Sequence, residues 1–220
     1  VTSVTFTGGG NIEIDDYAFM GCYYLTKVIL PATDGQAVIG DYAFAQVGRK
    51  IVNNTITYNE NGFTVENLDK VNVIGDYAFS NSNLSEAVLG DGLVAGEGAF
   101  YSSQVGKVTL GKASSYGLGA FQACKKLETV KLPDGSKMSD DEKITLGQAM
   151  FANCDKLGGL VDLSGVTDEI PVQAFYNSKL TAVRLGGVKV IGNGAFAECA
   201  ALGSVKFLSV VNGAKFESSA

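Results

Sequence analysis

One short pattern recurs along the whole chain: a small residue followed by phenylalanine, in a unit whose shortest repeat is 21 residues. Phe79, Phe100 and Phe121 show this minimal spacing, and longer gaps elsewhere, up to 35 residues, leave room for insertions. Repetition at a short period indicates a stack of similar units, none of which can bury its apolar face alone. The anchor phenylalanines are Phe19, Phe44, Phe79, Phe100, Phe121, Phe151, Phe175 and Phe196.

A second pattern follows each anchor and predicts a strand. Leu25, Val28 and Leu30 fall at the spacing Leu-x-x-apolar-x-apolar, and most later units repeat it. The final apolar-x-apolar step has a period of two, which is typical of a short strand with one buried face. A shorter β-like segment, such as residues 188–191, then leads into the next corner. The pattern predicts a mainly β, parallel solenoid of about eight coils with short second strands.

Composition argues against several classes of function. The chain has 220 residues and contains no His and no Trp. Without imidazole it lacks the commonest general base and metal ligand, so we expect no catalytic site, no metal site and no cofactor. The net charge of −6 argues against a nucleic-acid-binding protein, which normally carries a basic excess. Because no apolar run approaches 18 residues, we expect no membrane span in this segment.

Two stretches align the repeat elements especially well. IDDYAFMGCYYLTKVILP at 14–31 and LGAFQACKKLETVKLP at 118–133 place Ala-Phe, Cys and Leu in one register. In this register the chain resembles the BspA-like leucine-rich repeats of bacterial and some protist surface proteins. The resemblance implies one leucine-rich-repeat solenoid over residues 1–220, in a secreted or surface-anchored protein that adheres to host proteins or other cells. It carries over no catalytic residue.

The first strand, Val4-x-Phe6, has the pattern of the end of an earlier unit. We therefore expect the chain to be a fragment of a longer surface protein, and we expect a monomer.

Two units depart from the strand pattern. After Phe44, the run TITYNENGFTV has two β-prone halves around Asn-Glu-Asn-Gly, which predicts a β-hairpin insertion near residues 51–67. We expect it to project from the stack and to expose Tyr58 and Phe63. After Phe151, the segment LGGLVDL is one residue out of register beyond Leu160. A second insertion, residues 134–145, is acidic but has no calcium-loop spacing, so we expect a solvated loop.

Four cysteines occupy one column of the repeat. Cys22, Cys124, Cys154 and Cys199 each lie three residues after an anchor, where other units have Ser or Val. A position that accepts Cys, Ser and Val is typical of a tight buried pocket, which favours small packing residues. The alternative is a disulfide between Cys124 and Cys154, which lie in adjacent coils and within bridging range.

The outward face of the predicted sheet carries an excess of basic residues. Side chains alternate along a strand, so the residues between buried positions point to solvent. One outward column contains Ile29, Val88, Thr109, Lys131, Val161, Arg184 and Lys206, and its neighbour contains Lys27, Glu86, Lys107, Thr129, Gly159, Ala182 and Ser204. Five basic residues and one acidic residue predict a strip suited to an anionic glycan or an acidic protein segment. The alternative is a charged surface that merely keeps an exposed sheet soluble.

Tyrosines mark the N-terminal half. Tyr17, Tyr42 and Tyr77 share the slot two residues before the anchor, which later units fill with Gly98, Gly119, Gln173 and Gly194. Tyr is a favoured contact residue, so these side chains form a candidate aromatic ledge. The alternative is that each ring packs over its own turn.

Together these features predict a non-catalytic binding or adhesion module of a secreted or cell-surface protein, with a protein or glycan as its partner. A structural spacer that holds another domain away from the cell is the alternative. The candidate contact residues are Lys27, Lys107, Lys131, Arg184, Lys206, Tyr58, Phe63, Tyr17, Tyr42 and Tyr77.

Overall fold

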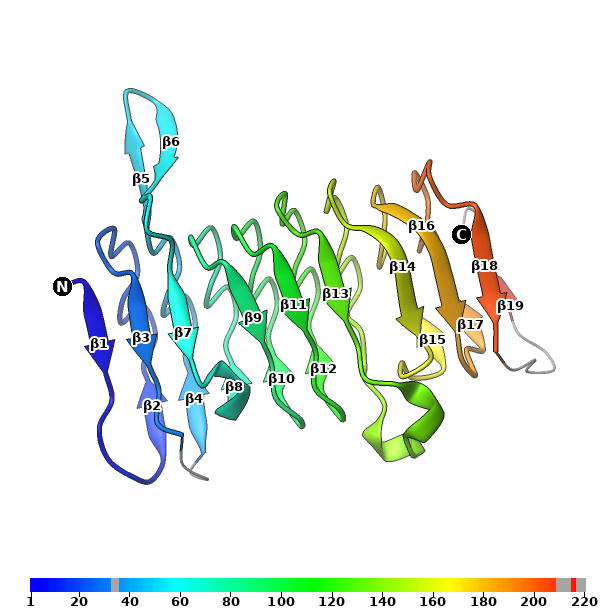
Figure 1. The fold of residues 1–220 in the computed structure, drawn as a ribbon, viewed down its shortest axis with the longest axis horizontal. Coiled ribbons are helices and arrows are strands. Elements are labelled where there is room, and N and C mark those ends of the chain that lie inside the picture. Colours follow the sequence, from blue (N-terminus) through cyan, green and yellow to red (C-terminus); the bar gives the residue numbers. More distant parts are fainter. Residues whose placement is uncertain (33–35, 209–214, 217–220) are drawn as a thin grey trace.

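The protein is an elongated stack of coils, seen side-on in Figure 1. The computed structural model describes residues 1–32, 36–208 and 215–216. Each coil places one main strand on one side of the stack. On the other side it has one short strand or, in the coil of residues 129–151, only isolated bridges at Ile144 and Thr145. Within the described residues, no helix is both long enough and apolar enough to cross a membrane.

The main strands form three parallel sheets in a row, with the orders β1-β3-β7, β9-β11-β13 and β14-β16-β18. Strand β1 pairs in register with β3, the next main strand, and Val4 lies opposite Val28. This pairing confirms that Val4-x-Phe6 belongs to a unit of its own. The main strands are β1 (Ser3–Thr5), β3 (Lys27–Ile29), β7 (Thr64–Glu66), β9 (Glu86–Val88), β11 (Lys107–Thr109), β13 (Thr129–Lys131), β14 (Gly158–Leu163), β16 (Lys179–Leu185) and β18 (Ser204–Phe207).

The short strands form two further parallel sheets, β12-β10-β8-β4-β2 and β15-β17-β19. They are only two to four residues long, because those up to Ile191 each lead directly into a corner. The short strands are β2 (Ile12–Ile14), β4 (Ala37–Ile39), β8 (Val71–Ile74), β10 (Val94–Ala95), β12 (Ser115–Tyr116), β15 (Glu169–Ile170), β17 (Val190–Ile191) and β19 (Lys215–Phe216).

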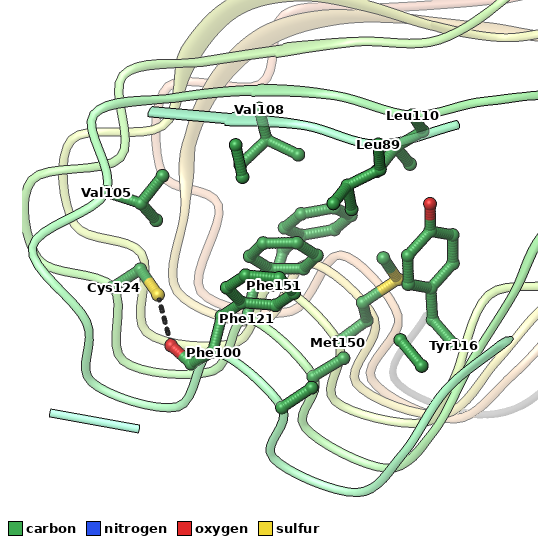
Figure 2. Packing of buried hydrophobic residues seen from close by; sticks show 14 of the residues in the cluster. Leu89, Phe100, Val105, Val108, Leu110, Tyr116, Phe121, Cys124, Met150 and Phe151 are labelled. Atoms are coloured by element: carbon green, nitrogen blue, oxygen red, sulfur yellow. Dashed lines mark hydrogen bonds between the residues drawn. The ribbon is translucent and has the colours of Figure 1, made fainter. Parts of the chain in front are cut away.

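The anchor phenylalanines form the core of the stack. Successive rings are stacked with centroids 4.6 to 5.5 Å apart, close to the spacing of about 4.8 Å between paired strands. Figure 2 shows Phe100, Phe121 and Phe151 in this column, with Val105, Val108 and Leu110 packed above them. The anchors from Phe44 to Phe175 are fully buried. The predicted solenoid and its phenylalanine column are therefore confirmed.

Two left-handed residues shape each corner, one two positions before the anchor and one two positions after it. Their φ angles lie between 52° and 70° in all eight corners. Glycine adopts this conformation without steric cost, which explains Gly98, Gly119 and Gly194 at the first position. The residue directly before the anchor is buried from Ala43 onward, so it must be small or must extend into the core.

The hairpin insertion has a different turn from the predicted one. Strands β5 (Arg49–Val52) and β6 (Thr55–Tyr58) pair antiparallel, and Figure 1 shows them projecting beyond the row of main strands. The two-residue turn is Asn53-Asn54, with φ angles of 49° and 59°. Positive φ at both positions is the requirement of a type I′ turn, and asparagine tolerates it. The expected turn at Asn-Glu-Asn-Gly instead leads the chain back to the stack.

Phe63 is a core residue, so its predicted exposure on the hairpin is wrong. Its side chain is fully buried, and its ring centroid lies 5.7 Å from that of Phe44. Phe63 bridges Leu84, whereas Val65 pairs with Val28. This unit therefore has one residue fewer between its first two apolar positions than the Leu-x-x-Val rule requires, which explains why the rule did not find β7.

The unit after Phe151 contains the predicted register shift. It falls between Gly159 and Leu160, where β14 pairs with β16. Val161, which we placed in the outward column, is buried and pairs with Val183. The outward residue is instead Asp162, which pairs with Arg184. The prediction for Val161 is wrong because the shift inverts which residues face the core.

The second insertion leaves the stack at the edge opposite the hairpin (Figure 1). It contains the 3₁₀ turns η2 (Gly135–Lys137) and η3 (Asp140–Glu142), and η1 (Leu68–Lys70) follows β7. Ser139 and Glu142 form a capping box around η3. Glu142 also accepts a salt bridge from Lys112 at 2.9 Å, which ties the insertion to the preceding coil.

The cysteines are all free thiols, so Cys124 and Cys154 are not bridged. The Cys124 thiol donates to the carbonyl oxygen of Phe100, the anchor one coil earlier, at 3.1 Å (Figure 2). Cys154 and Cys199 make the same contact with the anchors before them, at 3.2 and 3.1 Å. These three are buried, as small packing residues should be, whereas Cys22 is partly exposed.

Candidate functional site

A groove of about 700 Å³ opens where the hairpin meets the main strands. One wall is the return segment of the hairpin, residues 58–62. The Asn59 side chain donates to the carbonyl oxygen of Tyr23 at 2.8 Å, and the Asn83 side chain donates to that of Asn59 at 2.8 Å. Because these bonds run to a coil on either side, the wall is fixed to the stack.

The floor of the groove includes the residues that directly precede two main strands. Ser85 precedes β9 and Gly106 precedes β11, and the Gly106 N–H donates to the Ser85 carbonyl oxygen at 2.9 Å. Gly106 does not have a left-handed φ, and a Cβ added to it would meet only backbone oxygens at 3.7 and 3.8 Å, which is ordinary contact. The backbone therefore does not require glycine here, and the missing side chain leaves the groove deeper.

Six charged side chains line the groove: Glu60, Glu86, Glu128, Lys107, Lys126 and Lys156. Three carboxylates and three ammonium groups give the groove no net charge. Within the described part of the chain, none of the six forms a salt bridge or a side-chain hydrogen bond. Elsewhere in the described residues, seven salt bridges engage other lysines, Arg184 and other carboxylates. The charged groups of the groove are thus free to contact a ligand.

Tyr58 is the aromatic residue of the groove and lies half-buried at the base of the hairpin. Burial raises the pKa of its phenol, and the positive charge of Arg49 together with hydrogen bonds from Gln104 and Arg49 partly offsets this rise. The hydroxyl is therefore protonated at neutral pH. Tyr58 thus presents a neutral phenol, beside Arg49 and Gln104, to the groove.

The groove brings together two of the predicted contact residues, Tyr58 and Lys107. They were selected for unrelated reasons, one from the insertion and the other from an outward strand position. Phe63 is absent from the groove because it faces the core.

The outward face of the main sheets is less basic than predicted. Lys27 pairs with Glu66 at 2.6 Å, and Arg184 pairs with Asp162 at 3.3 Å. Neither acid was in the predicted columns, because both lie in the units whose register was misjudged. The register does place Arg184 beside Lys206, as expected. Across the ordered main strands, Lys131 and Lys206 have no salt-bridge partner.

The three tyrosines form a stack of their own. The ring centroids of Tyr17 and Tyr42 are 5.2 Å apart, and those of Tyr42 and Tyr77 are 5.3 Å apart. The Tyr77 hydroxyl donates to Glu97 at 2.6 Å, and this bond raises the pKa of Tyr77 to about 12. Each ring thus lies against its neighbours in adjacent coils. Tyr17, at the end of the stack, is 55% exposed.

Sequence patterns missed most of the groove. Lys126 and Lys156 both lie five residues after an anchor, and Gln104 and Gly106 lie between a corner and a strand. Comparing equivalent positions across units could have singled out Gly106, because it occupies the position that Ser85 has in the preceding unit. Nothing in the periodicity showed that the hairpin would supply a wall beside these positions.

Comparisons with known proteins agree with this architecture. A model of the BspA type Leucine rich repeat region, in 6 copies, matches residues 49–157 and 136–219. No curated protein matches the sequence. A leucine-rich repeat protein from Bacteroides ovatus has a similar fold, with a TM-score of 0.56 and 20% identity over 93% of this chain. The match spans 57% of that protein's chain.

Two further solved structures match more distantly. A leucine-rich repeat protein from Eubacterium ventriosum is 17% identical over 94% of this chain and 72% of its own, with a TM-score of 0.46. A leucine rich cell surface protein from Faecalibacterium prausnitzii is 14% identical over 97% of this chain and 89% of its own, with a TM-score of 0.27. Because the family model covers most of the chain, in six copies, the protein belongs to the BspA type leucine-rich repeat family.

Proposed function

We propose that the chain is a non-catalytic binding module of a secreted or cell-surface protein, and that it holds a protein or glycan ligand in the groove at the base of the hairpin. The observation that carries this proposal is the set of six charged side chains that line one groove without pairing among themselves. Removing charged groups from water costs free energy, and a ligand that hydrogen-bonds to these groups offsets that cost.

The arrangement of the groove also supports binding. Its residues come from several coils and from the insertion, as is common for binding surfaces of repeat arrays. A structural spacer would gain nothing from the projecting hairpin or from unpaired charges around a groove. The outward lysines and the tyrosine stack are further contact candidates for a large partner, and we propose that the module acts as a monomer.

A binding screen tests the proposal. The chain would be immobilised and exposed to glycan and extracellular-matrix protein arrays at low and high salt. We expect a ligand whose binding falls when Lys107 is replaced by Glu and is unchanged when Lys131, which lies outside the groove, is replaced by Glu. The reverse result would move the binding surface from the groove to the part of the outward face around Lys131. Absence of any ligand would favour the spacer.

A further inference from the structure

From the chemistry of the groove, we propose that its ligand is a short neutral oligosaccharide laid along the stack axis, with one sugar ring over Gly106. This inference rests on the proposed function, since it specifies what the groove binds. It differs from the anionic ligand that the outward lysines suggested.

Charge balance favours a neutral ligand. Glu60, Glu86 and Glu128 oppose Lys107, Lys126 and Lys156 within one groove. A polyanion placed there would meet three carboxylates, and a polycation would meet three ammonium groups, so like charges would cancel most of the attraction. A ligand without charge avoids both repulsions.

The mixture of donors and acceptors favours hydroxyl groups. A carboxylate can only accept hydrogen bonds and an ammonium group can only donate them, whereas a hydroxyl does both. A hydroxyl-rich chain can therefore satisfy Glu86 and Lys107 together, which are paired neighbours on β9 and β11. Hydrogen bonds to charged groups are also about twice as strong as neutral ones. Gln104 and Asn83 add amide groups to the same groove.

The shape of the groove argues against a peptide. Peptide recognition depends on pockets that desolvate large apolar anchors, or on the open edge of a sheet. The groove instead lies over residues that precede β9 and β11, beside the edge along which these two strands pair, and no large aliphatic side chain is among the described residues that line it. Tyr58 is the aromatic side chain among the described residues that line the groove, and its ring can pack against the face of one sugar.

Gly106 provides the sharpest test of the ligand's position, because neither its φ angle nor its neighbouring backbone atoms require glycine. A β-branched residue is stiff at χ1 and would fill the floor of the groove. Gly203 offers a matched control: it precedes β18 as Gly106 precedes β11, its N–H makes the equivalent bond to Thr181, and an added Cβ would meet nothing within 4 Å. Gly203 lies outside the groove.

The experiment is calorimetric titration of the full chain with neutral gluco-, manno-, galacto- and xylo-oligosaccharides, with an oligouronate and with a peptide of alternating Lys and Glu. We expect at least one neutral oligosaccharide to bind, with little change at high salt. Gly106→Ile should weaken that binding about tenfold or more by displacing ligand hydrogen bonds, while Gly203→Ile should not change it. Circular dichroism spectra and urea midpoints of the two variants should agree with the parent.

Each other outcome is decisive. Binding of the oligouronate or the peptide instead, sensitive to Gly106→Ile, would overturn the neutral-sugar inference but leave the groove as the binding site. Binding of a neutral sugar that both glycine variants leave unchanged would overturn the placement over Gly106. If no arrayed glycan or protein binds at all, the proposed function itself fails.

Discussion

Replacing Phe63 with alanine should destabilise the solenoid where the hairpin rejoins the main strands. The Phe63 side chain is fully buried, with ring centroids 5.7 Å from Phe44 and 6.5 Å from Phe79. A phenylalanine of this kind removes roughly 150–250 Å² from water, which corresponds to about 4–6 kcal/mol at 25 cal/mol per Å². Measured Phe→Ala changes in cores cost about 3–5 kcal/mol. We expect a loss of about 4 kcal/mol in the free energy of unfolding.

Urea unfolding followed by far-ultraviolet circular dichroism measures this loss. The control is Ile56→Ala on the hairpin, where the side chain is 50% exposed and the expected change is within about 0.5 kcal/mol. Units of a solenoid contact mainly their neighbours, so the transition can lose cooperativity when one unit is weakened. The slope of the transition should therefore be compared along with its midpoint.

Equal midpoints for Phe63→Ala and Ile56→Ala would refute the placement of Phe63 in the core. That result would mean that β7 does not join the sheet in solution and that Phe63 belongs to the projecting insertion. It would also remove the return segment that forms one wall of the groove.

Three further predictions concern the corners, the thiols and the second insertion. Gln173→Gly should raise the free energy of unfolding by about 1 kcal/mol, and so raise the urea midpoint, because Gln173 holds a φ of 55° that favours glycine; a lower midpoint would contradict this. A thiol reagent should modify the partly exposed Cys22 in the folded protein, whereas burial raises the pKa of Cys154, which should react only after unfolding. The Lys112 hydrogen bond lowers the pKa of Glu142 to about 2. The stability that Glu142 contributes is therefore present above its unfolded pKa of about 4.3 and lost as pH falls towards 2, so Glu142→Gln should reduce acid sensitivity in that window only.

The regular part of the fold could be predicted because its strands and corners follow from short, repeated residue spacings. The anchor spacing and the apolar-x-apolar steps recur with little change, so the strands and the phenylalanine column follow from a count along the chain. The unit with Phe63 could not be predicted in this way. Asn53-Asn54 and Asn61-Gly62 are both turn signals, and choosing between them requires the pairing of Val65 with Val28, a contact between distant residues.

The groove was harder to predict than the fold. Lys107 follows from strand alternation and Tyr58 from the insertion, yet neither pattern says that they share a surface. Their proximity depends on where the hairpin rejoins the stack, and this is set by the Asn59 and Asn83 bonds. The spacing of apolar residues does not indicate which backbone carbonyl a side-chain amide bonds to, so only the structure shows these hydrogen bonds.

A residue difference between repeat units indicates function only if packing does not explain it. The change from Tyr77 to Gly98 in one corner slot has a steric cause, because a Cβ on Gly98 would lie 2.3 Å from the Tyr77 ring. The left-handed backbone of Tyr17, Tyr42 and Tyr77 costs roughly 1–2 kcal/mol per residue, and ring stacking offsets about 0.5–1.5 kcal/mol per pair. The absence of a side chain at Gly106 has no such cause, since a Cβ fits there and the φ is ordinary. Packing therefore accounts for where the tyrosine stack ends. It does not account for the open floor of the groove at Gly106, and because Gly203 has the same property outside the groove, only the ligand titration of the two isoleucine variants separates a binding role from a tolerated glycine.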